Sequence, residues 1–148
     1  MRKRICVSLM ALSFLVSMAT VAPAYTGSVN GMKAQVPFDF YLGERLVTAG
    51  EYTVRSLTGD EAALRIGNSR QGASVLTSSA RERGNGEGRA RLVFHKYGDQ
   101  YFLYAVWGTD NQGRILRESK RERSLRKEVR SAQAGAAAGM EEVVVAAL

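Results

Sequence analysis

The chain has 148 residues, which provide for about one domain. Charged residues make up 24% of the sequence and apolar residues 45%, and these ordinary values exclude wholesale disorder and fibrous repeats. The formal net charge at pH 7 is +7. None of these values identifies a reaction.

The N-terminus has the features of a cleaved secretory signal, in the required order. Three basic residues (2–4) precede an apolar run (5–22), and this run ends in the small-residue site Ala-Pro-Ala at 22–24. We therefore predict cleavage after Ala24 and export to the periplasm or the extracellular space. No membrane span is expected after cleavage.

Removal of the signal changes the cysteine count and the charge. Cys6 is the only cysteine and lies inside the signal, so the exported form would have none. This excludes disulfides, thiolate nucleophiles and zinc sites with cysteine ligands for that form. The net charge falls to +4, and the excess of basic residues lies in the segment 117–130.

The middle of the chain is typical of short antiparallel strands between glycine turns. Apolar residues alternate in the segment 36–42, with Val36, Phe38, Phe40 and Leu42 on one face. Pro37 cannot donate to a neighbouring strand, which predicts an edge position. Further strands are expected at 52–57, 62–67, 73–77 and 114–118, with turns at 58–61 and 68–72.

The densest aromatic region, 91–107, predicts a hairpin with a two-residue turn at 98–99. Both faces of this hairpin are apolar, which fits central strands of a closed barrel or a sandwich. We expect Phe94, Leu103 and Trp107 to lie inside the fold.

The C-terminal part predicts a helix at 119–132. The segment has a thin apolar stripe at Leu125, Val129 and Ala132, and Glu122 with Arg126 is a supporting pair at the four-residue spacing. An Ala/Gly-rich linker follows. The apolar residues in 142–148 are either a returning strand or an unpaired end.

These elements predict an all-β fold, a small antiparallel barrel or sandwich of seven to eight short strands, with a basic C-terminal helix. The expected boundaries are a signal peptide at 1–24, an N-terminal linker at 25–35, the β domain at 36–118, the basic helix at 119–132, and the linker with its final apolar stretch at 133–148.

Four segments carry a resemblance to a known group of proteins. They are Val-Pro-Phe-Asp-Phe at 36–40, Ala-Gly-Glu-Tyr-Thr-Val at 49–54, Leu-Val-Phe-His-Lys-Tyr-Gly at 92–98 and Tyr-Phe-Leu at 101–103. Together they resemble a family of small exported bacterial all-β proteins over about residues 36–126. The resemblance implies export and a compact β fold. The family has no assigned activity, so no functional residue carries over.

His95 is the sole histidine, so any Ser-His-Asp catalytic triad would have to include it. The hairpin turn places it on the face of Phe102, Tyr104 and Val106, where a structural imidazole bonded to a tyrosine or a carbonyl is expected. One histidine without cysteines does not form a conventional zinc site. We expect no catalytic residue, no metal and no cofactor. The candidate ligand-binding residues are His95, Tyr97, Phe102 and Tyr104.

Two further segments carry alternative interpretations. The glycine-rich segment 84–88 lacks the strand and the Lys-Ser/Thr helix start of a phosphate loop, and is interpreted as part of a flexible loop at 78–89. The basic segment 117–130 is a solvated charged helix or a contact for anionic surfaces such as lipid headgroups and envelope polymers. The residues that would make this contact are Lys120, Arg121, Arg123, Arg126, Lys127 and Arg130.

The sequence favours an exported non-enzymatic envelope or secreted module that binds a protein partner, a polymer or a small ligand. Two alternatives stay open: a lipocalin-like carrier of a small apolar ligand, and a small hydrolase that uses His95. A filled interior distinguishes the module from the carrier. A hydrolase would need a carboxylate and a nucleophile held against His95. Nucleic acid is not an expected partner, because no recognition module is present.

We predict that the exported protein begins at Tyr25, because the basic start, the apolar run and the peptidase site occur in the order that secretion requires. N-terminal sequencing of the extracytoplasmic protein measures this start directly. Recovery of a chain that still begins at Met1 in the membrane fraction would contradict the prediction.

Overall fold

The computed structural model describes residues 29–81, 88–132 and 140–148. The predicted signal peptide and residues 82–87 of the predicted loop lie outside these ranges. Ten strands and one helix form within them: β1 (Lys33–Val36), β2 (Phe40–Leu42), β3 (Arg45–Val47), β4 (Gly50–Ser56), β5 (Ala63–Gly67), β6 (Gly72–Arg81), β7 (Arg91–Tyr97), β8 (Gln100–Trp107), β9 (Gln112–Leu116), α1 (Lys120–Ala132) and β10 (Glu141–Ala146).

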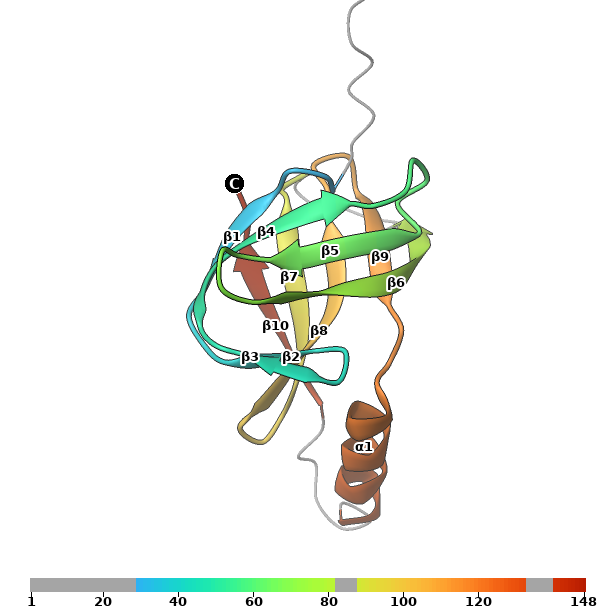
Figure 1. Ribbon diagram of the computed structural model, residues 1–148. Helices are drawn as coiled ribbons and strands as arrows, with labels where there is room; N and C mark the ends of the chain where they lie inside the picture. Colours follow the sequence, from blue (N-terminus) through green and yellow to red (C-terminus); the bar gives the residue numbers. More distant parts are fainter. Residues whose placement is uncertain (1–28, 82–87, 133–139) are drawn as a thin grey trace, which may run out of the picture.

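The strands form two layers, which cross steeply in Figure 1. The front layer contains β1, β4, β5 and the first half of β6, and the back layer contains the second half of β6 with β9, β8, β7 and β10. Neighbouring strands within both layers are antiparallel. The hairpin of β2 and β3 joins β8 through one parallel pair, Tyr41 with Phe102. The all-β prediction is confirmed, with ten strands where seven or eight were expected.

Two corners connect the layers. The first half of β6 (72–76) pairs with β5 and the second half (77–81) with β9, so one strand belongs to both layers. At the other corner Ala34 bridges Ala147, and Lys33 and Leu148 exchange backbone hydrogen bonds of 3.1 and 2.8 Å. The final apolar stretch is therefore a strand, β10, that connects β7 with β1.

The ordered fold begins before the predicted domain boundary. Residues 25–35 were expected to be a linker, but this segment contributes most of β1 and the buried side chains of Val29 and Met32. Burial of these two side chains ties the segment to the core.

The predicted strand at 36–42 is two strands, β1 and β2, separated at Pro37. Proline lacks an N–H group and interrupts a strand ladder. After it, the carboxylate of Asp39 accepts the backbone N–H of Ala49 at 2.8 Å, which fixes the bend. The predicted face is buried at Val36, Phe40 and Leu42, and partly buried at Phe38.

Aromatic rings join the two layers in the interior. Phe40 of β2 contacts Tyr52 of the front layer and Phe94 of the back layer edge-on, at centroid distances of 5.0 and 5.2 Å. All three side chains are 0% exposed, so side chains fill the space between the layers. The aliphatic residues buried with them are Val29, Val36, Leu42, Val47, Val54, Leu64, Ile66 and Leu92.

A β-bulge in the central hairpin changes which residues face this core. The pairing of β7 with β8 skips Tyr104, which leaves one extra residue in β8 and shifts the alternation of the strand. Tyr104 lies with His95 and Phe102, as predicted. Val106, which was predicted on the same face, instead lies in the core opposite Leu92, so this part of the prediction was wrong.

Trp107 is also displaced from its predicted place inside the fold. It is half-buried and outside the core cluster, whereas Phe94 and Leu103 are buried as predicted. Its indole lies over Gly113 of β9, where an added Cβ would clash with the ring. The guanidinium of Arg91 stacks 5.3 Å from the ring centroid.

The predicted helix is α1, but its apolar stripe does not carry its contact with the domain. Leu125 and Val129 are half-buried and Ala132 is exposed, and Glu122 is the buried residue of the helix. Neither α1 nor any other described segment is a helix long and apolar enough to cross a membrane.

We predict that Phe94→Ala lowers the free energy of unfolding by about 3–5 kcal/mol, because it empties a fully buried aromatic position. Leu46→Ala is the matched control, since Leu46 is 53% exposed and its truncation should change stability by only about 0.5 kcal/mol. Urea unfolding curves measure both values. A loss below about 1 kcal/mol for Phe94→Ala would show that the interior is not packed around this ring.

Candidate functional site

The start of α1 positions the side chains that meet the predicted ligand-binding face. Ser119 is the N-cap residue, and its hydroxyl accepts the backbone N–H of Glu122 at 3.0 Å. The carboxylate of Glu44, in the turn between β2 and β3, accepts the N–H of Lys120 at 2.6 Å. A carboxylate at this end also favours the helix dipole. These contacts fix the helix beside the outer face of β7 and β8.

Glu122 connects the helix to His95. Its Oε1 lies 2.9 Å from His95 Nδ1, and the two side chains are only 7% and 14% exposed. The predicted pair of Glu122 with Arg126 does not form. Arg126 instead donates two hydrogen bonds to Glu118, at 2.8 and 3.1 Å, because Glu122 points toward the sheet.

The imidazole of His95 lies among aromatic rings. It stacks on Tyr104 at a centroid distance of 4.0 Å and meets Tyr97 edge-on at 6.3 Å. The expected partner was a tyrosine or a carbonyl, and the observed partner is a carboxylate. Among the described residues, no serine or threonine hydroxyl is hydrogen-bonded to His95. A histidine and a carboxylate are therefore present without the nucleophile that a triad requires.

Tyr97 lies beside the same carboxylates. Burial, and then the negative charges of Glu122 and Glu118, raise the pKa of Tyr97 to about 12, and the charge of Arg126 opposes this rise. The phenol therefore stays protonated at neutral pH. It can serve as a hydrogen-bond donor but not as a phenolate.

Phe102 completes the aromatic face and is covered on its outer side. Its ring stacks on Tyr41 at 4.9 Å, and the guanidinium of Arg121 lies 4.6 Å from the Tyr41 ring. Arg121 also donates to the Gln100 side chain. The structure thus brings the four predicted ligand-binding residues, His95, Tyr97, Phe102 and Tyr104, onto one face and covers most of that face with α1 and β2.

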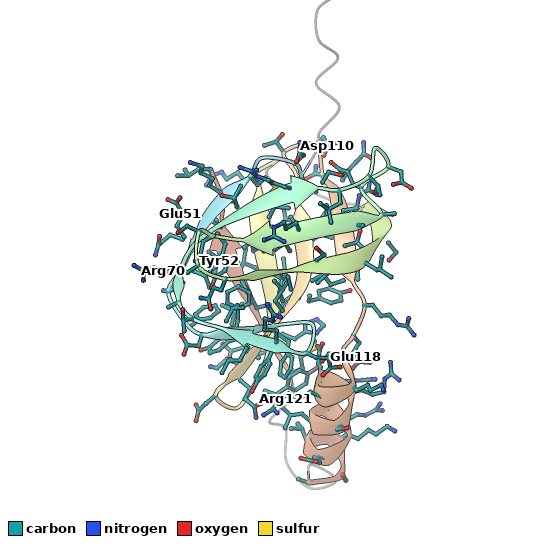
Figure 2. All side chains as sticks on the ribbon, viewed as in Figure 1. Glu51, Tyr52, Arg70, Asp110, Glu118 and Arg121 are labelled. Carbon is teal, nitrogen blue, oxygen red and sulfur yellow. The ribbon has the colours of Figure 1, made fainter. Side chains whose placement is uncertain are left out.

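The basic residues of the helix divide into two groups. Arg121 contacts Gln100 and Tyr41 of the domain, whereas Arg123 and Arg126 contact Glu118. Figure 2 labels Arg121 and Glu118 at the end of the helix nearest the sheet. The other three residues predicted to contact anionic surfaces, Lys120, Lys127 and Arg130, are exposed.

A groove on the outer face of the front layer was not predicted from the sequence. It has a volume of about 700 Å³ and is formed by β4, β5 and the loop 68–71. Arg55 of β4 and Arg65 of β5 line it as direct cross-strand partners, and Arg70 comes from the loop. Figure 2 shows Glu51 and Arg70 on the same side of the molecule, where β4 begins. The sequence signal is weak, because it consists of single arginines in alternating strands.

The loop beside the groove is held by side-chain hydrogen bonds. The Asn68 side chain accepts the backbone N–H groups of Arg70 and Gln71, both at 2.9 Å. Gln71 donates to the buried Tyr52 hydroxyl at 2.7 Å. An added Cβ at Gly67 would lie 2.8 Å from the Gln71 carbonyl oxygen, so a glycine is required for the close approach of the loop.

The described residues contain no group of three or more histidine, cysteine, aspartate or glutamate side chains that could hold a metal ion. Comparisons of the chain with protein-family models, with curated proteins and with solved structures find no significant match.

We predict that Glu122→Ala lowers the free energy of unfolding by about 1.5–3 kcal/mol, because it leaves the buried Nδ1 of His95 without its hydrogen-bond partner. It also lowers the pKa of Tyr97, since burial and the Glu122 charge both raise that pKa. Chemical unfolding measures the first effect. Absorbance of tyrosinate between pH 9 and about 12, compared with Tyr97→Phe, measures the second.

The control is Glu128→Ala, which removes an exposed carboxylate from the same helix. It should change stability by about 0.5 kcal/mol or less and leave the Tyr97 pKa unchanged. An equal decrease in the free energy of unfolding for Glu122→Ala and Glu128→Ala would contradict a specific role of Glu122.

Proposed function

We propose that the protein is an exported, non-enzymatic module that binds its partner on its outer surface. The observation that carries this proposal is the filled interior. Phe40, Tyr52 and Phe94 are 0% exposed, and the ring of Phe40 contacts the other two rings between the layers. A carrier of an apolar ligand needs a cavity lined by such side chains, and here those side chains occupy the space themselves.

The surroundings of His95 weigh against the hydrolase alternative. Its Nδ1 is committed to Glu122, and its ring is stacked on Tyr104 beside the helix. A general base needs a nucleophile within hydrogen-bond reach, and no serine or threonine hydroxyl among the described residues is hydrogen-bonded to His95. The pair of His95 and Glu122 therefore fits a structural link between α1 and the sheet.

Export supports an envelope or secreted location for this binding. It rests on the signal-like sequence at 1–24 and on the absence of cysteine from the rest of the chain. A partner in that compartment is a protein, a polymer or a small polar molecule.

We expect the purified protein to show no turnover of generic ester, peptide or glycoside substrates and to release no apolar ligand on organic extraction. His95→Gln should fold with a loss of stability of about 1 kcal/mol, because one hydrogen bond is altered. It should retain the same partner as the wild type when envelope extract is passed over the immobilised proteins and the eluate is analysed by mass spectrometry.

Two results would reverse the proposal. Turnover by the wild type that disappears in folded His95→Gln would favour the hydrolase. A stoichiometric apolar molecule in the extract of the purified protein would favour the carrier.

A further inference from the structure

Two arginines lie directly opposite each other on the outer face of the front layer. Arg55 and Arg65 are cross-strand partners and both are exposed. Like charges in such a pair repel each other and destabilise the sheet. Neither they nor Arg70 form an ion pair with a residue in the described ranges. Departures of this kind from local stability rules are expected mainly at functional sites.

The three arginines line one groove and outnumber its single carboxylate, Glu51. The guanidinium group presents a planar fork of donors that matches the two oxygens of a carboxylate or phosphate. An oxyanion between Arg55 and Arg65 would neutralise their repulsion. The groove therefore has the positive charge and the kind of donor group that an oxyanion site requires.

The remainder of the groove indicates what carries the oxyanion. Its volume of about 700 Å³ lies in the range of small-molecule sites, which exceeds what an oxyanion alone would need. No aromatic and no large aliphatic side chain from the described part of the chain lines it, which disfavours an apolar ligand. Hydroxyl and amide groups supply the lining instead. Thr53 and Ser69 can pair with hydroxyl groups of a ligand, whereas the side chains of Thr48, Asn68 and Gln71 also form the hydrogen bonds that hold the loop.

The groove is also preformed. The loop that carries Arg70 is held because the Asn68 side chain accepts two backbone N–H groups and the Gln71 side chain donates to Tyr52. The Arg45 guanidinium donates to the carbonyl of Gly72 at 3.0 Å, at the start of β6. A preformed site loses little conformational entropy on binding.

We propose that this groove binds a sugar acid or a sugar phosphate, with Arg55, Arg65 and Arg70 on the oxyanion and the polar lining on the sugar hydroxyls. The inference rests on the proposed binding function and names the class of its ligand. The shared chemistry is an oxyanion on a polyhydroxylated ring, whether the ligand is free or part of an envelope polymer.

Isothermal titration calorimetry at low ionic strength tests the assignment with four probes. These are glucuronate, glucose 6-phosphate, glucose and inorganic phosphate. We expect the better of the two sugar anions to bind at least about tenfold more tightly than glucose and than inorganic phosphate. Tighter binding of glucuronate identifies a carboxylate ligand, and tighter binding of glucose 6-phosphate identifies a phosphate ligand. Inorganic phosphate that binds as tightly as both sugar anions would overturn the saccharide assignment.

Two variants and a control locate the site. Arg55→Thr and Arg65→Thr keep a residue suited to strands and should each weaken binding of the sugar anion by about tenfold or more. Arg117→Thr removes an exposed positive charge outside the groove, so its affinity should equal that of the wild type. If Arg55→Thr binds the sugar anion as tightly as the wild type does, the groove is not the binding site.

The unliganded variants give a second readout that does not depend on the probes. Removal of the repulsion should raise the melting temperature of Arg55→Thr above that of the wild type, and Arg117→Thr should show no such rise. A melting temperature of Arg55→Thr below the wild-type value would contradict the claim that Arg55 and Arg65 repel each other in the unliganded protein. A protein that captures an envelope partner but binds neither sugar anion would keep the proposed function and lose this inference.

Discussion

The contact of Phe40 with both layers is the constraint on which the rest of the structure depends. Its ring lies between Tyr52 and Phe94, and this cluster fills the space where a ligand cavity would otherwise form. The β2–β3 hairpin that carries Phe40 also supplies Glu44, which caps α1. Packing in the interior and placement of the helix are therefore coupled through one short hairpin.

A filled interior leaves the outer face for function. On one side, α1 covers the aromatic face, and it is attached by polar contacts of Lys120 and Glu122 rather than by an apolar stripe. On the other side, the front layer carries the arginine groove without any covering element. The charged groups at the helix-covered aromatic face already form hydrogen bonds within the domain. The arginines of the groove, by contrast, form no ion pair with the described residues, so their donors are available to a ligand. This difference supports the proposal that the groove is the binding surface.

Much of the strand pattern was predictable, because alternation and turn residues act over a few neighbouring positions. The turn at 98–99 correctly placed His95 beside Phe102. Two predictions failed where one residue shifted the alternation or interrupted a strand. The bulge at Tyr104 turned Val106 inward, and the interruption at Pro37 divided one expected strand into two. A bulge depends on the twist and packing of both strands, so the residues of a single strand do not reveal it.

The sequence by itself determined the all-β class, the hairpin with its aromatic face and the start of the helix at Ser119, because each depends on residues close together in the chain. Only the tertiary structure decided which side chains contact one another across different elements. Glu122 reached His95 rather than Arg126 because the capped helix directs that carboxylate toward the sheet. Arg55 met Arg65 because the packing of Val54 and Ile66 fixes the register of β4 with β5. Contacts between strands depend on which faces are buried together, and that is a property of the whole core.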